Sequence, residues 1–83
     1  MKEMPPLIAL DIETTGLLPE TGERICEIAL LKIQKGKIID EFVSLLNPEK
    51  PISLGASTVS GITDEMVKDS PTFKEIAENI LIF

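Results

Sequence analysis

The stretch Leu7–Leu17, with the sequence LIALDIETTGL, constrains this chain most, because an apolar run passes directly into a polar turn. Side chains alternate between the two faces of a β-strand, so Asp11 and Glu13 share one face with the small Ala9. The uncharged run before Asp11 predicts a central strand rather than an exposed edge. The turn at Thr14–Gly16 ends this strand abruptly.

The spacing of the two acids predicts a metal site. Two carboxylates on one face of a buried strand repel each other and are costly to desolvate, which a bound cation relieves. Hard oxygen ligands of this kind favour Mg²⁺ or Mn²⁺ over Zn²⁺. A pair of merely solvated acids on a surface strand is the alternative interpretation.

Two further strands follow and form a hairpin. Residues 24–34 and 38–46 are rich in Ile, Leu and Val, and a Lys-Gly pair between them is typical of a tight turn. In the first of these strands Cys26 is expected on the same face as Ile28 and Leu30. Apolar residues on its other face indicate burial on both sides. Together with the acidic strand, the hairpin predicts a three-stranded antiparallel sheet.

The last third of the chain predicts short helices. A short helix or turn is expected at 54–59, and Thr63 is expected to cap a brief helix that ends near Lys68. Ser70 is expected to cap the last helix, with proline at its first position. From Phe73 onward, apolar residues recur at i, i+3, i+4, i+7 and i+8, an amphipathic stripe that we expect to cover one face of the sheet.

The run Asp11–Leu17, DIETTGL, resembles the first exonuclease motif of the DEDD 3′–5′ exonucleases, in particular the proofreading subunit or domain of bacterial DNA polymerase III. Val59–Thr63, VSGIT, resembles a second landmark of that family. The resemblance implies an α/β architecture: a partial ribonuclease-H-like fold with a three-stranded antiparallel sheet and one or two C-terminal helices. It also implies that residues 1–83 are the N-terminal part of an exonuclease domain whose second half is absent.

The resemblance assigns catalytic, metal-binding roles to Asp11 and Glu13. Family members are similar in holding two metal ions with four acids, and two such ions stabilise the attacking and leaving oxygens of a phosphodiester. By this resemblance Asp11 bridges both ions, and Glu13 holds the ion that activates water. Glu27, an acid in a largely apolar strand, is interpreted as a charged edge position or a partner of Arg24, rather than as support for the metal site.

The turn after the acids is implied to bind substrate. In the family it receives the terminal nucleotide, which makes Thr14, Thr15, Gly16 and Leu17 substrate-binding residues: the region of Thr14 for the 3′ hydroxyl and Leu17 for the terminal base. A plain strand-to-loop turn with Leu17 in the core is the alternative. Ser60 stands where relatives often carry a His that touches the terminal nucleotide. A loop that enters a capped helix is the alternative there.

The chain lacks the rest of the family's chemistry. It contains no His and no Tyr, so no residue here supplies the His or Tyr base of the family's later motifs. The remaining aspartates, Asp40, Asp64 and Asp69, lie outside any recognisable partner motif. Two acids hold Mg²⁺ weakly, because the ion keeps most of its waters. We therefore expect the chain alone to be inactive, or nearly so, as a nuclease.

The net charge of the chain limits how it can bind nucleic acid. The net charge is −6, whereas a protein that grips nucleic acid by electrostatics alone is normally basic. Contact with a single-stranded 3′ end of DNA is therefore expected to be local and metal-assisted, with help from a polymerase subunit or the missing half of the domain.

The single cysteine, Cys26, is expected in the core. No secretory signal or membrane-spanning segment is predicted, so the expected location is cytoplasmic.

Several interpretations stay open. The first is a 3′–5′ exonuclease that hydrolyses terminal phosphodiesters of DNA by a two-metal mechanism, as part of a replicative or proofreading polymerase or of a larger fused enzyme. The second is a non-catalytic, truncated exonuclease-like module that mediates assembly and self-associates through the apolar end Ile80–Phe83. The third is an exoribonuclease of the same family that trims RNA ends.

Overall fold

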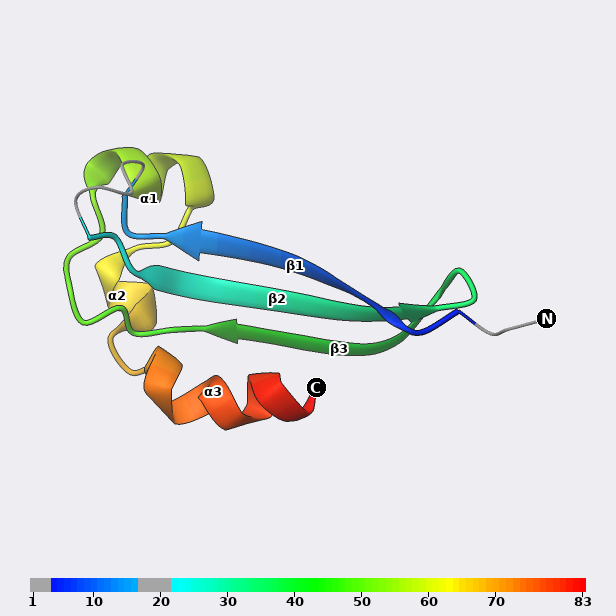
Figure 1. Ribbon diagram of the computed structural model, residues 1–83. Helices are drawn as coiled ribbons and strands as arrows, with labels where there is room; N and C mark the ends of the chain where they lie inside the picture. Colours follow the sequence, from blue (N-terminus) through cyan, green and yellow to red (C-terminus); the bar gives the residue numbers. More distant parts are fainter. Residues whose placement is uncertain (1–3, 17–21) are drawn as a thin grey trace.

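Three antiparallel strands organise the protein, whose computed structural model describes residues 4–16 and 22–83 (Figure 1). The strands are β1 (Leu7–Thr14), β2 (Ile25–Gln34) and β3 (Lys37–Leu45). The order in the sheet is β1-β2-β3, with antiparallel pairing throughout. The three-stranded sheet predicted from the apolar runs is confirmed.

β1 lies at the edge of this sheet, so the expectation of a central strand is wrong for the described residues. The hairpin of β2 and β3 supplies β1 with a partner on one side only. Leu7, Leu10 and Ile12 are consequently 57%, 62% and 40% exposed. An apolar strand with one open hydrogen-bonding edge is an unusual surface, because such edges attract further strands.

Three helices follow the sheet: α1 (Leu54–Ser60), α2 (Asp64–Val67) and α3 (Phe73–Ile82). The predicted N-cap Thr63 is confirmed, since its hydroxyl accepts a hydrogen bond from the Met66 N–H at 3.3 Å. Within the described part of the chain, none of these helices is long and apolar enough to cross a membrane.

α3 begins later than predicted, because Thr72 rather than Ser70 is its N-cap. The Thr72 hydroxyl accepts from the Glu75 N–H at 3.3 Å, and the Glu75 carboxylate accepts from the Thr72 N–H at 2.9 Å. This reciprocal capping box satisfies two otherwise unpaired donors. The Ser70 N–H instead donates to the Val67 carbonyl at 3.0 Å and so belongs to the end of α2.

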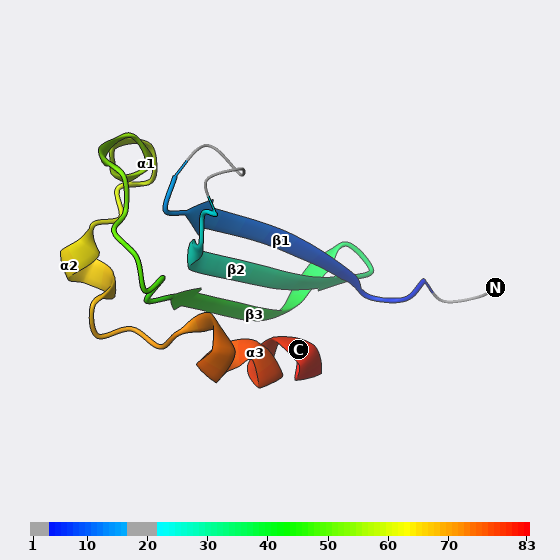
Figure 2. The same ribbon diagram turned by 60° about the vertical axis from the view of Figure 1, so that its left-hand side comes forward.

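The helices divide the core into two clusters. α1 and α2 gather at the end of the sheet where β1 and β3 finish, whereas α3 runs back alongside β3 (Figures 1 and 2). The cluster at the end of the sheet contains Cys26, Ile52, Ala56, Ile62 and Val67. The cluster beneath the sheet contains Ile28, Leu30, Leu46 and Ile76, with Ile25, Phe42, Ile80 and Phe83 packed against it.

A register shift in β2 decides which cluster Cys26 joins. Glu13 lies opposite Glu27, and the pairing slips by one residue directly afterwards, which leaves Cys26 as the extra residue of a bulge. Cys26 therefore packs with α1 and α2, whereas Ile28 and Leu30 pack against α3. The expected shared face of the three residues is wrong for this reason, although the expected burial of Cys26 is confirmed at 0% exposure.

The molecule is elongated, with principal extents of 50 × 23 × 22 Å and a radius of gyration of 14.9 Å. A compact domain of this length has a radius of gyration of roughly 12 Å. The difference arises because the sheet is covered by α3 over only part of its surface, and β1 extends beyond that cover (Figure 2).

Candidate functional site

The pairing of β1 with β2 places Asp11 and Glu13 on one face of the sheet. Asp11 lies opposite Ala29 and Glu13 opposite Glu27, and directly opposed residues of antiparallel strands share a face. Leu10 and Ile12, which alternate with the acids, lie opposite Leu30 and Ile28 and so share the face that α3 partly covers. Asp11 is exposed and Glu13 is half-buried, so both carboxylates are accessible to a ligand.

The face that carries the two acids is locally negative. Glu27 lies directly opposite Glu13, and like charges in this arrangement repel each other. Among the described residues, Arg24 forms its ion pair with Glu49, at 3.7 Å, rather than with Glu27 as expected from the sequence. In the described ranges, no three acids, cysteines or histidines come close enough together to form a complete metal site. The arrangement thus offers a cation two carboxylates, with the carboxylate of Glu27 on the same face.

The polar turn after β1 is held by its own hydrogen bonds. The Thr14 hydroxyl donates to the Gly16 carbonyl at 2.6 Å, which closes the turn locally. Thr15 is 1% exposed, so it faces the protein rather than solvent. Leu17, the fourth residue implied to bind substrate, lies outside the described residues.

Thr15 connects three segments of the chain. Its N–H donates to the Arg24 carbonyl at 2.8 Å, and its carbonyl accepts from the Ser53 N–H at 2.8 Å. Its hydroxyl accepts from the Arg24 N–H at 3.0 Å and donates to the Glu23 carboxylate at 3.1 Å. These bonds join the end of β1 to the start of β2 and to the N-cap of α1. Thr15 therefore anchors the turn from within.

Glu23 and Lys50, which the sequence did not single out, complete this anchor. The Lys50 ammonium lies 2.6 Å from the Glu23 carboxylate, and the two side chains are 33% and 14% exposed. A Cβ atom built on Gly16 would lie 1.3 Å from the second Glu23 oxygen, so the carboxylate rests where a side chain would be. No local pattern indicates this pair, because its members are 27 residues apart in sequence.

Ser60 is the last residue of α1, which lies beyond the end of β1 (Figure 1). Its hydroxyl oxygen accepts from the Ile62 N–H at 3.1 Å. Gly61 follows with φ of 78°, a left-handed conformation that ends the helix and suits glycine. Ser60 thus helps to form a helix-terminating turn, and α1 lies at the end of the sheet where β1 finishes (Figure 1).

Cys26 touches the acidic strand from the inside. Its thiol lies 3.5 Å from the Glu13 carbonyl oxygen. Burial, and after it the negative charge of Glu13, raises the pKa of this thiol above its ordinary value of 9.0. Cys26 is therefore a protonated core residue and supplies no ligand to the candidate site.

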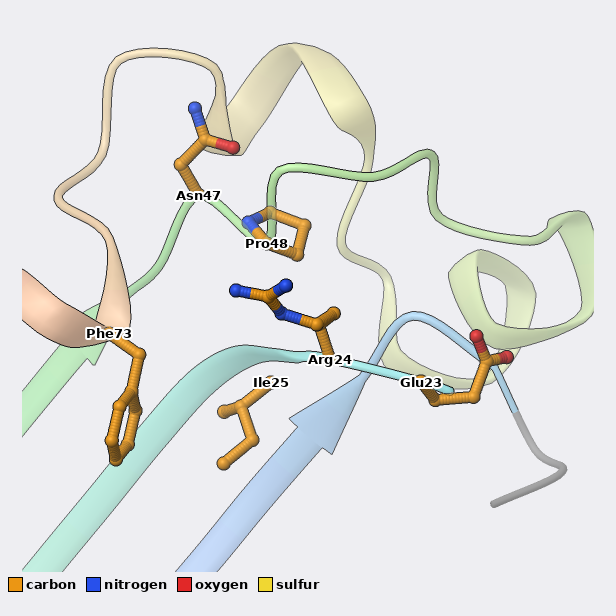
Figure 3. A pocket seen from close by; sticks show the side chains of 6 residues that line it. All are labelled: Glu23, Arg24, Ile25, Asn47, Pro48 and Phe73. Atoms are coloured by element: carbon orange, nitrogen blue, oxygen red, sulfur yellow. The ribbon is translucent and has the colours of Figure 1, made fainter. Parts of the chain in front are cut away.

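A cavity of about 240 Å³ lies at the start of β2 (Figure 3). The Arg24 side chain extends between Ile25 and Pro48, and the Glu23 carboxylate points away from Phe73. Neither of the two candidate acids lines this cavity; its lining residues are Glu23, Arg24, Ile25, Asn47, Pro48 and Phe73. The cavity is thus separate from the candidate metal site.

The model of the exonuclease family RNase_T matches residues 8–83 of the chain. The chain belongs to this exonuclease family. It is 41% identical over 81 residues to the PolC-type DNA polymerase III of Thermotoga petrophila, covering 98% of this chain and 6% of that protein. It is 42% identical over 80 residues to the epsilon subunit of DNA polymerase III from Rickettsia prowazekii, covering 92% of this chain and 34% of that subunit.

Solved structures support the same assignment. The chain matches exonuclease X, solved in complex with 5′-overhanging duplex DNA, with a TM-score of 0.78 and 33% identity over 88% of this chain and 42% of the other. The nuclease domain of 3′hExo, a DEDDh family member solved with bound rAMP, matches with a TM-score of 0.78 over 90% of this chain and 41% of the other. At 23% identity, the second match shows the fold alone.

The family model and the two polymerase III relatives confirm the resemblance to exonucleases of the DNA polymerase III type. The solved structures confirm the predicted ribonuclease-H-like fold. The chain spans 6% of the PolC-type polymerase and 34% of the epsilon subunit described above. The family generally uses divalent metal ions, and the two accessible carboxylates on β1 are chemically suited to one.

Proposed function

We propose that this chain is the N-terminal part of a 3′–5′ exonuclease domain that hydrolyses terminal phosphodiesters of DNA within a replicative or proofreading polymerase. The observation that carries the proposal is the placement of Asp11 and Glu13 on one face of β1, directly before the Thr14–Gly16 turn, in a chain that the exonuclease family model matches. A cytoplasmic location and a polymerase partner accompany this function.

In this proposal Asp11 and Glu13 hold Mg²⁺ or Mn²⁺. Both residues offer hard oxygen ligands, and Glu27 opposite Glu13 adds to the negative field that a cation relieves. A bound divalent ion supplies charge neutralisation at the phosphate and lowers the pKa of a bound water. The chain's own part is to fix the two carboxylates, which the pairing of β1 with the central strand β2 achieves.

The terminal nucleotide is proposed to bind at the turn. Thr14 and Gly16 lie directly after the acids, and the hydrogen bond from the Thr14 hydroxyl to the Gly16 carbonyl closes the turn. Leu17 and Ser60 are proposed as further contacts, to the terminal base and to the nucleotide. Thr15 has a different part, because its backbone and side-chain groups are engaged within the protein. We propose that Thr15 acts on the nucleotide only by holding the turn in place.

The open edge of β1 is proposed as the place where the remainder of the domain pairs. Leu10 is 62% exposed and Ile12 is 40% exposed, which is a large apolar surface for a strand that carries ligands. The remainder is proposed to supply the two further aspartates and the His or Tyr base, since this chain has no His or Tyr. The chain alone should therefore be inactive, or nearly so.

Metal titration of the purified chain tests the proposal. Manganese binding, followed by electron paramagnetic resonance, should be weak in the wild-type chain and fall by at least about tenfold when both proposed ligands are neutralised. The test variant is Asp11→Asn with Glu13→Gln. The matched control is Asp40→Asn with Glu41→Gln, which removes the same charge from β3. Equal losses in both variants would show non-specific attraction and contradict the site.

An activity assay on 5′-labelled single-stranded DNA and RNA tests the remaining parts. No shortening from the 3′ end is expected with the chain alone. Cleavage that a chelator abolishes would contradict the proposed need for the rest of the domain. If active protein that contains the complete domain shortened RNA but left DNA intact, the exoribonuclease alternative would replace the DNA proposal.

The exposed end of α3 favours a second candidate, an assembly module. Leu81 and Ile82 are 85% and 78% exposed. Phe83 instead folds back, with its ring 6.5 Å from that of Phe42 and 4.9 Å from the Lys32 ammonium. If this end mediates self-association, sedimentation should show an oligomer that Leu81→Glu dissociates. A monomer at all concentrations would exclude this route to assembly.

A further inference from the structure

Glu23 is a largely buried acid outside the metal-binding pair. It lies two residues before β2 begins, and its side chain is 14% exposed. One carboxylate oxygen accepts hydrogen bonds from the Thr15 hydroxyl at 3.1 Å and from the Lys50 ammonium at 2.6 Å. A buried carboxylate is stable only when its charge is compensated, and Lys50 provides that compensation.

The same carboxylate also fills the space beside Gly16. Its other oxygen lies 1.3 Å from where a Gly16 Cβ would be, so the glycine admits the carboxylate against the backbone of the turn. Glu23 thus contacts two successive residues of the turn, and Thr15 carries the contact onward to the Ser53 N–H at the start of α1.

A nearby ion pair is more exposed than the Glu23–Lys50 pair and makes no hydrogen bond to Thr15 through its acid. Arg24 and Glu49 lie 3.7 Å apart, with side chains 55% and 57% exposed. Surface pairs of this kind contribute little. Glu49 is therefore a matched control: it is an acid on the segment that carries Lys50, it is paired to a cation, and it does not share the hydrogen bonds of Thr15.

We propose that Glu23, held by Lys50, is a positioning residue that fixes the Thr14–Gly16 turn in the conformation that receives the terminal nucleotide. The inference rests on the proposed function for the identity of the ligand, a nucleotide. The clamp, by which we mean Glu23 held by Lys50 against Thr15 and Gly16, is argued from the contacts of Glu23. Ordering a flexible loop at the moment of binding reduces affinity, and a turn that is already fixed avoids this loss. Glu23 would therefore affect nucleotide binding without touching nucleotide or metal.

Amide hydrogen exchange measured by NMR tests the clamp. In Glu23→Ala, and independently in Lys50→Met, the Thr15 and Ser53 amides should exchange at least about tenfold faster, because a charge-assisted bond that restrains local opening is lost. Amides at the centre of β2 should keep their wild-type rates. Glu23→Gln retains an acceptor for the Thr15 hydroxyl and should lie between Glu23→Ala and wild type. Glu49→Ala should change none of these rates.

Binding experiments on the same proteins connect the clamp to the nucleotide. Deoxyadenosine monophosphate, titrated in the presence of Mn²⁺, should bind Glu23→Ala and Lys50→Met at least about fivefold more weakly than wild type, because the turn must then be ordered on binding. The affinity for Mn²⁺ alone should stay within about twofold at physiological ionic strength, because neither variant changes Asp11 or Glu13 and salt screens the altered charge.

The outcomes separate the clamp from the proposed function. Unchanged exchange at Thr15 and Ser53 in both variants would overturn the clamp, as would uniform acceleration throughout the sheet. A loss of Mn²⁺ affinity in Glu23→Ala equal to that in Asp11→Asn would make Glu23 a ligand and also overturn it. A wild-type chain that binds neither Mn²⁺ nor the nucleotide would contradict the proposed function, while the exchange rates would still decide the clamp.

Discussion

Replacing Gly16 with alanine should destabilise the chain, because the new side chain would collide with the carboxylate of Glu23. The new Cβ would lie 1.3 Å from a Glu23 oxygen, so the two cannot coexist. Gly16 is not among the glycines with positive φ, so alanine is compatible with its backbone. The side chain of Glu23, rather than the backbone, must therefore move.

The magnitude follows from what Glu23 loses when it moves. Its carboxylate accepts one bond from Lys50 at 2.6 Å and one from the Thr15 hydroxyl at 3.1 Å. Hydrogen bonds to charged groups contribute about 1.5–3 kcal/mol each, reduced here because Lys50 is 33% exposed and Glu23 can re-solvate. We expect Gly16→Ala to lower the free energy of unfolding by about 1–2 kcal/mol, or roughly 4–16 °C in melting temperature.

A double-mutant cycle isolates this effect. In a Glu23→Ala background the obstructing carboxylate is gone, and Gly16→Ala should be neutral or stabilising by up to about 1 kcal/mol, because alanine restricts the unfolded chain. The coupling energy between positions 16 and 23, from thermal unfolding of the four proteins, should therefore exceed about 1 kcal/mol. Additive effects within about 0.3 kcal/mol would refute the reasoning, since contact between the positions requires coupling.

Three further predictions follow from burial, capping and titration. Leu46 is 0% exposed, and Leu46→Ala should cost about 2–5 kcal/mol in urea unfolding, whereas Leu54→Ala at 83% exposure should cost less than about 0.5 kcal/mol. Hydrogen bonds from the backbone and side chain of Thr72 lower the pKa of Glu75 below 4.5, so the cap stabilises α3 above pH 4.5 and this stabilisation is lost as pH falls through the depressed pKa. Thr72→Ala keeps the backbone N–H and should raise the Glu75 pKa part of the way back to 4.5; an NMR titration that found it unchanged would contradict the contribution of the Thr72 hydroxyl. Cys26 should react with iodoacetamide at pH 8 at least about a hundredfold more slowly in the native chain than in denaturant, and equal rates would contradict its burial and raised pKa.

Some features of the site could be predicted because they depend on neighbours in sequence. A two-residue spacing on any β-strand places Asp11 and Glu13 on one face, whatever the rest of the sheet does. The period of the apolar residues likewise determined the hairpin and the face of α3 that carries Ile76. The motif Asp11–Leu17, backed by Val59–Thr63, indicated the exonuclease family, which the family model then confirmed.

The tertiary structure decided what depends on distant partners. An apolar strand has the same sequence signature at the centre or the edge of a sheet. Within residues 4–16 and 22–83, β1 pairs with β2 and with no other strand, which makes it an edge strand. The bulge at Cys26 moved that residue from one core cluster to the other by a slip that no period encodes. Thr15 was read as a ligand-binding residue from its place in the motif. Its burial and the Glu23–Lys50 clamp exist only because folding brings together groups 27 residues apart, where their charges and hydrogen bonds compensate one another.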